Sequence, residues 1–417
     1  MQVSLTTMRA ISVFASFVAL AVASGCAVEP ADESGDEAAT EDALVTAACP
    51  AGTTLVKRIE ACGARGAKAP QSLLDASARA SFGHVIRPAG FDEPGAPCLP
   101  ALVCQDDAAP TLLFSDSPEM PNKDGILYAD TIGAGRYRAY VYHANGSATP
   151  RRFPVALYNP GTQPARAVVT KRGVVAPSKE YAAIGRDVAA EHMASSVRKT
   201  IEVPAGKRVL LDAELAGLVA DKDELVQAMI DFETDRELKI TFASLSGSAR
   251  ADVVPLELPV LGRDGHDRGT FPKAGFVVVA PAAAGDTGVR RLRLGTGDVE
   301  PLAQGVDVLT GKKLGLGGNY GVTYEVRVAM PKGGTVGLSP RGGEWAGAMR
   351  LEAPGARAVE GAVPAGAEPL SDGARRSRSA RSAPATRRSA SSPAAARTRR
   401  STSSSSASDP QVLGSAA

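Results

Sequence analysis

Aromatic residues and histidines are scarce in this chain, and their scarcity removes several kinds of functional site. Phe, Trp and Tyr make up 5% of the 417 residues, and Trp345 is the only tryptophan. The chain has four histidines; His143, His192 and His266 fall in a turn, an expected helix and a loop, which does not favour a shared copper or zinc site. A G-x-S-x-G nucleophile motif and a P-loop are also absent. We therefore expect no metal and no cofactor.

Cysteine is absent after residue 104, and the first cysteine stands at a distinctive place. Cys26 follows Arg9, an apolar stretch at 10–23 and the small residues Ser24-Gly25. This order is typical of a bacterial lipoprotein signal peptide, here 1–25. The apolar stretch is shorter than the about 20 residues of a membrane-spanning helix. We expect a lipid on Cys26 that holds the protein outside the cytoplasm, on the bacterial outer membrane or cell surface; an ordinary secretory signal is the alternative.

The remaining cysteines, Cys49, Cys62, Cys98 and Cys104, all lie in an N-terminal segment at 49–111. An even number in an exported chain predicts two disulfides, with three pairings open. The shortest loops favour Cys49–Cys62 and Cys98–Cys104. A zinc site made of all four is the rival interpretation, but the close C-x-x-C pairs typical of zinc are missing.

Charge is distributed unevenly along the chain. The spacer at 26–48 carries seven acidic residues and no basic one, whereas the tail at 354–417 is rich in Arg, Ser and Ala. Neither stretch has enough apolar surface to fold, so we expect both to be disordered. The near-neutral middle argues against specific nucleic-acid binding, which needs a concentrated basic face.

Short alternating strands separated by turn signals dominate the middle of the chain. The stretches 153–158 and 165–170 flank Asn159-Pro160-Gly161 and predict a hairpin, and 198–212 and 229–244 each predict another. This spacing predicts a mainly β protein with two β-sandwich units, immunoglobulin-like or jelly-roll-like, at 112–250 and 251–353.

Helical spacing interrupts the strands at 178–198, where Ser178 is an expected cap. A second short helix is expected at 221–226, because Asp221 can cap it and Glu224 stands three residues on.

Several phrases of the sequence resemble a known group of proteins. These are SDSPEMPNKDGILYAD at 115–130, the Asn159-Pro160-Gly161 turn, PAGK at 204–207, RGTFP at 268–272 and GNYGVTY at 318–324. Together they resemble an uncharacterised family of bacterial secreted and surface proteins, some labelled copper amine oxidase-like because a different domain lies beside this one. The resemblance covers about 112–345 and implies an extracytoplasmic β-rich protein. It implies no catalytic residues, and the tyrosine-derived cofactor and three-histidine copper motif of amine oxidases have no counterpart here.

Two groups of residues are candidates for ligand binding. Tyr140 and Tyr142 share a strand face with Arg138, which predicts a partly exposed aromatic face that could stack on sugars. Asp264, His266 and Asp267 lie in an expected loop between the two units, where they form either a ligand or metal site or a solvated linker.

These observations favour a non-catalytic binding or structural module of the cell envelope. Its expected partners are the membrane, through the lipid, and an envelope polysaccharide or a surface protein. The alternative is a hydrolase or metal-dependent enzyme with its site between the two β units.

Overall fold

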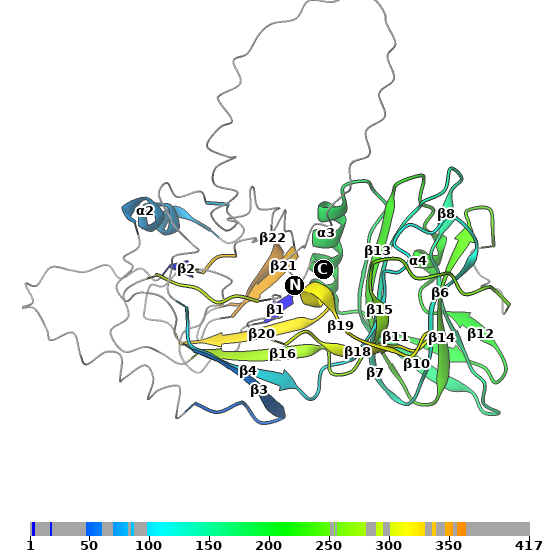
Figure 1. Cartoon of the computed structure of the whole chain (residues 1–417), viewed down its shortest axis with the longest axis horizontal. Coiled ribbons are helices and arrows are strands. Elements are labelled where there is room, and N and C mark those ends of the chain that lie inside the picture. Colours follow the sequence, from blue (N-terminus) through cyan, green and yellow to red (C-terminus); the bar gives the residue numbers. More distant parts are fainter. Residues whose placement is uncertain are drawn as a thin grey trace, which may run out of the picture.

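The computed structural model describes residues 47–60, 70–81, 85–86, 98–250, 254, 257–280, 289–294, 301–329, 336–338, 347–352 and 357–363, with the backbone of 2–4 and 17–18. Strands dominate these residues, which confirms the mainly β class. Figure 1 shows two facing sheets on one side of helix α3 (Tyr181–Ala194) and a third sheet on the other.

The central element is an eight-stranded sheet in the order β11-β10-β13-β7-β5-β15-β18-β19. Its strands are β5 (Thr111–Ser115), β7 (Gly135–Ala144), β10 (Ala165–Val174), β11 (Lys199–Val203), β13 (Leu225–Thr234), β15 (Arg268–Phe271), β18 (Gln304–Asp307) and β19 (Lys312–Gly315). Only the pair β5–β7 is parallel. Strands from both expected units, 112–250 and 251–353, are therefore hydrogen-bonded within one sheet.

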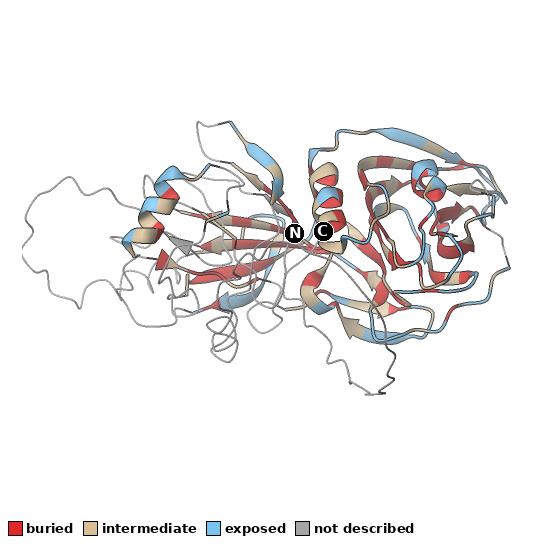
Figure 2. Cartoon of the chain, turned by 90° about the horizontal axis from the view of Figure 1, so that it is seen from above, coloured by how far each residue is buried: buried red, intermediate tan, exposed pale blue. Residues whose placement is uncertain are grey.

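A second sheet, in the order β12-β9-β14-β6, covers one face of the central sheet. It contains β6 (Gly125–Ile132), β9 (Val155–Tyr158), β12 (Arg208–Leu210) and β14 (Leu238–Ser246), with β8 (Arg151–Arg152) paired to β14. Apolar side chains of both sheets, such as Val141, Ile230 and Phe242, form one core between them, called here the apolar core. Figure 2 shows buried residues along these strands and exposed residues in the loops that join them.

Consecutive strands in this region lie in opposite sheets. β9 pairs with β12 and β14, whereas β10, which follows the Asn159-Pro160-Gly161 turn, pairs with β11 and β13. The same crossing occurs between β11 and β12 and between β13 and β14. The three hairpins predicted from the sequence are therefore wrong. Each turn is an arch between the sheets, because every strand buries its apolar face against the facing sheet rather than pairing with its chain neighbour.

The third sheet has the order β1-β20-β16-β4-β3 and lies toward the opposite face of the central sheet. Its strands are β1 (Gln2–Ser4), β3 (Thr53–Ile59), β4 (Ala101–Asp106), β16 (Gly275–Ala280) and β20 (Thr323–Val328). A second core, called here the helix-side core, joins Phe276 and Tyr324 of this sheet to Tyr140 of the central sheet and Val188 of α3.

Two short strand pairs complete the β structure. β17 (Val289–Arg290) pairs with β2 (Phe17–Val18), and β21 (Gly347–Leu351) pairs with β22 (Val359–Val363) next to α3. Because β22 falls inside the tail predicted to be disordered from residue 354, that boundary was set too early. The rest of the tail lies outside the described residues.

The helix predicted at 178–198 is confirmed as α3, although Ser178 is not its N-cap. The N-cap is Glu180, whose N–H donates to Ser178 Oγ at 3.1 Å. The helix predicted at 221–226 is wrong: Asp221 N–H donates to Glu224 Oε2 at 2.8 Å, but Asp223 has a φ of 64° and the chain turns into β13.

Two helices were not predicted. α4 (Ala213–Gly217) begins after Asp212, whose side chain accepts a hydrogen bond from Leu215 N–H, and α2 spans Gln71–Arg79. None of the described helices is long and apolar enough to cross a membrane.

The predicted disulfide pairing is wrong. Cys49 is bonded to Cys104, with their Cα atoms 5.9 Å apart. Residues 47–50 lie over β4 because β3 pairs antiparallel with that strand. The register of the sheet, rather than the length of the loop, therefore determines that Cys49 bonds to Cys104. Cys98 is also disulfide-bonded, which removes the thiolates that the zinc interpretation needs. Cys26 and Cys62 lie outside the described residues.

Candidate functional site

The candidate site is built on the last residue of β5 and the loop that follows it, residues 115–121, called here the site loop. It contains the cis peptide bond Ser117–Pro118 and carries two acidic side chains, Asp116 and Glu119. Three side chains from other elements hold it: His143 from β7, Arg268 from β15 and Asp264 from the loop before β15.

His143 holds the site loop by hydrogen bonds as a neutral ring. Its Nδ1 lies 2.9 Å from the Pro118 carbonyl oxygen, which can only accept, so Nδ1 carries the proton. Nε2, 2.9 Å from Ser115 Oγ, therefore accepts from that hydroxyl. Burial lowers the pKa of His143 to about 4, which keeps the ring uncharged at neutral pH.

Arg268 holds the loop through its backbone. Its Nη1 donates to the carbonyl oxygens of Leu127 at 2.8 Å, Leu261 at 3.0 Å and Ser117 at 3.3 Å. Its charge is balanced by Asp307, whose Oδ2 is 3.2 Å from Nε, and both side chains are buried. The site loop is thus fixed to β6, β15 and β18 at once.

Asp264 and His266, two of the residues singled out from the sequence, contact the site loop, although both side chains are exposed. Asp264 accepts hydrogen bonds from Ser117 Oγ and Glu119 N–H, both at 2.8 Å. His266 lies between two carboxylates, with Nε2 3.0 Å from Glu119 Oε2 and Nδ1 3.2 Å from Asp264 Oδ2. Burial opposes ionisation of Asp264, but the hydrogen bonds donated by Glu119 N–H, His266 N–H and Ser117 outweigh it and hold its pKa below the usual range.

Asp267, the third of these residues, has other partners. Its Oδ1 is 2.6 Å from Arg263 Nη2, and its Oδ2 accepts from Gly317 N–H at 3.2 Å. Arg263 Nε in turn donates to the His266 carbonyl oxygen at 2.9 Å. These contacts brace the 263–267 loop against the short turn at 317–319.

Asp116 is the residue that the sequence analysis missed. Its Oδ1 is buried and has no hydrogen-bond partner among the described residues. Burial raises the pKa of Asp116 well above its usual range, and the charges of Glu119, Asp264 and Asp267 raise it further. Glu119 also has a raised pKa, mainly from burial, which His266 partly offsets. A signal was present in the run Ser115-Asp116-Ser117-Pro118-Glu119, where two acidic residues follow directly after a strand.

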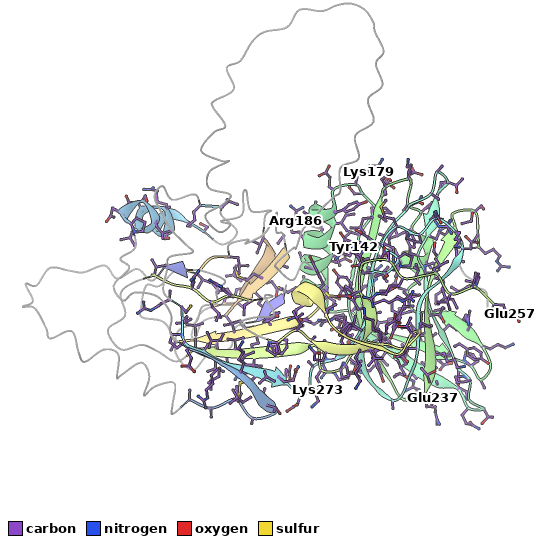
Figure 3. The ribbon with its side chains drawn as sticks, in the orientation of Figure 1. Tyr142, Lys179, Arg186, Glu237, Glu257 and Lys273 are labelled. Atoms are coloured by element: carbon purple, nitrogen blue, oxygen red, sulfur yellow. A yellow bond between two sulfur atoms is a disulfide. The ribbon has the colours of Figure 1, made fainter. Side chains whose placement is uncertain are left out.

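Three tyrosines lie near the acidic groups. One of them belongs to the buried core, and the other two are partly exposed at the candidate site. Tyr140 is wrongly predicted as exposed: it is 1% exposed, stacks on Phe114 at 4.9 Å and accepts a hydrogen bond from Gln227 Nε2 at 2.9 Å. Tyr142 and Tyr320 are partly exposed, and burial together with the charges of Asp116 and Glu119 raises the pKa of both. Figure 3 shows Tyr142 beside α3, where its ring meets that of Tyr181 edge-on at 6.4 Å.

The three histidines within the described part of the chain do not meet in a shared site. His192 lies beside Asp231, His143 hydrogen-bonds to the site loop, and His266 lies at its surface; His84 is outside the described residues. No group of three or more His, Cys, Asp or Glu side chains is placed to hold a metal ion in the ranges that the structure describes.

Comparison with known proteins yields no matching family model, no curated relative and no solved structure of significant similarity. The resemblance to the family of bacterial surface proteins therefore stays a prediction. The site combines a loop held by His143, Arg268 and Asp264, a carboxyl group whose Oδ1 has no partner among the described residues, three further acidic side chains and partly exposed tyrosine rings.

Proposed function

We propose that the protein is a non-catalytic binding module of the cell envelope, lipid-anchored through Cys26, whose site loop binds a hydroxyl-rich ligand, an envelope polysaccharide. The observation that carries this proposal is the Asp116 carboxyl group, whose Oδ1 is buried without a hydrogen-bond partner among the described residues and whose charge acts on Tyr142 and Tyr320. A buried acceptor without a partner costs free energy in the ligand-free protein, and a ligand donor removes that cost.

The surroundings of Asp116 suit a sugar ligand. Carboxylate oxygens accept hydrogen bonds from sugar hydroxyls, and the amphipathic rings of Tyr142 and Tyr320 offer an apolar face next to a polar edge. The supports of the site loop, His143 and Arg268, are buried, so little ordering is needed on binding. A preorganised site of this kind loses less conformational entropy when the ligand arrives.

The extracytoplasmic part of the proposal is supported by the signal sequence and by the disulfide bonds. Cys49–Cys104 is a bond type that persists in oxidising compartments and is rare in the cytosol. The lipid on Cys26 is tested by the intact mass of the protein isolated from its native membrane: a diacyl or triacyl adduct is expected, and an unmodified thiol would refute the anchor.

The binding function is tested with immobilised envelope polysaccharides and isothermal titration calorimetry. We expect saturable binding by the wild-type protein, a loss of at least tenfold in affinity for Tyr142→Ala and Asp116→Asn, and no change for Glu237→Gln. Glu237 is a matched acidic control, because it is exposed and lies far from Tyr142 (Figure 3). Equal binding by all four proteins would refute the proposed site.

One observation favours a second candidate function, hydrolysis of a glycan by acid–base catalysis. The pKa of Asp116 is raised and that of Asp264 is lowered, and carboxyl groups with separated pKa values are typical of an acid and a base that work together. Release of reducing sugar ends that Asp116→Asn abolishes would establish this function. Binding of the glycan without release of reducing ends would support the non-catalytic binding function.

A further inference from the structure

The balance of charge around Asp116 specifies the ligand further. The charges that act most strongly on Asp116 come from Glu119, Asp264 and Asp267, and all three are acidic. Two cationic side chains lie in the same cluster: Arg263 pairs with Asp267 through Nη2 at 2.6 Å and leaves its buried Nη1 without a partner among the described residues, and His266 lies between Glu119 and Asp264. Neither of these side chains donates to Asp116 Oδ1, and the charges that act on Asp116 among the described residues are acidic.

We infer that the ligand is an amino sugar polymer with free primary amines, one of whose ammonium groups binds at Asp116. This inference rests on the proposed function and narrows its ligand class. An ammonium group provides both missing elements at once, a donor and a positive charge, and charge-assisted hydrogen bonds are about twice as strong as neutral ones. The faces of Tyr142 and Tyr320 add a favourable cation–π environment if they lie within about 6 Å of the ammonium.

An N-acetylated sugar does not satisfy the same site. Its amide N–H donates a single hydrogen bond and carries no charge, and its methyl and carbonyl groups would meet a cluster of carboxylates. The carbonyl oxygen cannot accept from Asp264 or Glu119 when these groups are ionised, because an ionised carboxylate only accepts. A protonated Asp116 could donate to it, but that hydrogen bond joins two neutral groups and lacks the assistance of charge. Discrimination between the two sugars therefore arises from the acidic surroundings as well as from Asp116.

Binding of an ammonium group is expected to release a proton. In the free protein the raised pKa keeps Asp116 protonated above the usual range of a carboxyl group, and a positive charge beside it favours the ionised form. The affinity should therefore rise with pH until the ligand amine itself loses its charge. The titratable groups that face Asp116 during this change are Glu119, Asp264, Asp267, His266, Tyr140, Tyr142 and Tyr320.

The inference is tested with a matched pair of ligands. Isothermal titration calorimetry compares a glucosamine oligomer with the N-acetylglucosamine oligomer of the same length, on the wild-type protein, Asp116→Asn and Glu237→Gln. Two buffers with different ionisation enthalpies and no primary amine report the number of protons released. We expect the free-amine oligomer to bind wild type and Glu237→Gln at least tenfold more tightly than the acetylated one, with release of a proton. Asp116→Asn should bind both oligomers equally and release none.

Each outcome has a distinct meaning. Equal binding of the two oligomers by the wild-type protein would overturn the inference and leave the proposed function standing. Binding of neither oligomer, together with failure on other envelope polysaccharides, would overturn both. Amine-selective binding that Asp116→Asn leaves unchanged, or that releases no proton, would place the ammonium elsewhere and also overturn the inference.

Two further measurements keep the test interpretable. Asp116→Asn is expected to fold and to be at least as stable as wild type at neutral pH, because it removes a buried carboxyl group; its thermal unfolding checks this. A lysine-rich peptide serves as a second ammonium source. If only the peptide binds, and does so through Asp116, the partner is a protein and the amino sugar assignment is overturned.

Discussion

The two faces of the central sheet differ in the side chains that they bury: one face is apolar and the other carries polar and charged groups. On β13, Val226, Ala228, Ile230 and Phe232 point into the apolar core, whereas Gln227, Met229 and Asp231 point to the helix side. The neighbouring strand β7 repeats the contrast, with Ala139 and Val141 on one face and Arg138 and Tyr140 on the other. Both faces are buried, but along these stretches of β7 and β13 only the first is lined by apolar side chains alone.

The charged groups on the helix side are stabilised by partners from other elements, although Gln227 Oε1 and His192 Nδ1 are buried there without a hydrogen-bond partner among the described residues. Arg138 holds Asp231 with two hydrogen bonds, at 2.6 and 2.9 Å, and donates to Gly321 O at 2.7 Å. His192 of α3 lies 3.0 Å from Asp231 on the same side. Burial opposes ionisation of Asp231, yet Arg138 and His192 outweigh it and hold its pKa well below the usual range. This one cluster therefore ties α3, β7, β13 and the turn before β20 together.

The largest loss of stability is expected when Arg138, a charged residue of the helix side, is replaced. Arg138→Met leaves Asp231 buried without its charge partner, and we expect a loss of about 3–5 kcal/mol in the free energy of unfolding. Chemical denaturation measures the effect. Arg136→Met is the matched control on the same strand: its ion pair with Glu233 is exposed and 3.9 Å long, so about 0–1 kcal/mol is expected.

The double variant Arg138→Met, Asp231→Leu separates charge from packing. It removes both charges and should recover most of the stability that Arg138→Met loses. If the double variant is no more stable than the single one, the cluster acts through shape and hydrogen-bond geometry rather than through charge balance.

Acid is the second way to distinguish the faces, because His143 is a titratable group facing the apolar core. Its folded pKa of about 4 lies below the unfolded value of about 6.5, so the unfolded chain binds a proton first as the pH falls. Its contribution is complete above about pH 6.5 and is lost as the pH falls toward 4, a change of roughly 3 kcal/mol.

His143→Gln tests this linkage, since glutamine can still donate to the Pro118 carbonyl but does not titrate. The variant should show a flatter dependence of unfolding free energy on pH between 6.5 and 4 than the wild-type protein. His192 also has a pKa lowered by burial, so the wild-type slope contains a second contribution that His143→Gln leaves in place. An unchanged slope would show that His143 is not a neutral buried ring.

A matched pair of tyrosines compares the two faces of β7 directly. Tyr140→Phe leaves the buried Gln227 amide without the hydroxyl to which it donates, at an expected cost of about 1–3 kcal/mol. Tyr137→Phe removes an exposed hydrogen bond to Gly133 O and should cost less than about 1 kcal/mol. Equal costs from denaturant unfolding would contradict the view that the helix side depends on satisfied polar groups.

The smallest effect is expected from a single methyl group in the apolar core. Ile230→Val should cost about 0.5–1.5 kcal/mol, because the surrounding side chains fill the space only partly. It should leave the pH dependence of stability unchanged, because it alters no titratable group. A pH-dependent cost, measured by unfolding at pH 5 and pH 8, would show that Ile230 is coupled to a titratable group such as His143, which faces the same core.

The sequence was sufficient for the class of fold and for one helix, because both depend on local periodicity. Alternation along β7 and the spacing of Ile184 and Val188 on α3 are readable without any knowledge of neighbours. The pairing of strands was not readable, because Asn159-Pro160-Gly161 bends the chain equally well within a sheet and between sheets. The Cys49–Cys104 bond was missed for the same reason, since it depends on which strand lies beside β3.

The candidate site was readable only in part. Asp264 and His266 were visible as polar residues in one loop, but their partners Ser117 and Glu119 are more than a hundred residues away in the chain. Asp116 and Arg138 carried no local sign of burial, because a charged residue in a sequence is expected at the surface. Their environment becomes known only when β5, β7 and the 263–267 loop are placed side by side.

The arches between the facing sheets have a consequence for how the chain reaches this state. When β9 and β10, β11 and β12, and β13 and β14 lie in different sheets, a strand cannot find its hydrogen-bond partner in the next segment of chain. Most strand pairs must close a long loop before their hydrogen bonds and packing stabilise the chain. Folding should therefore be slow for a protein of this size. The rate at which the native state forms is thus set less by its stability than by its connectivity.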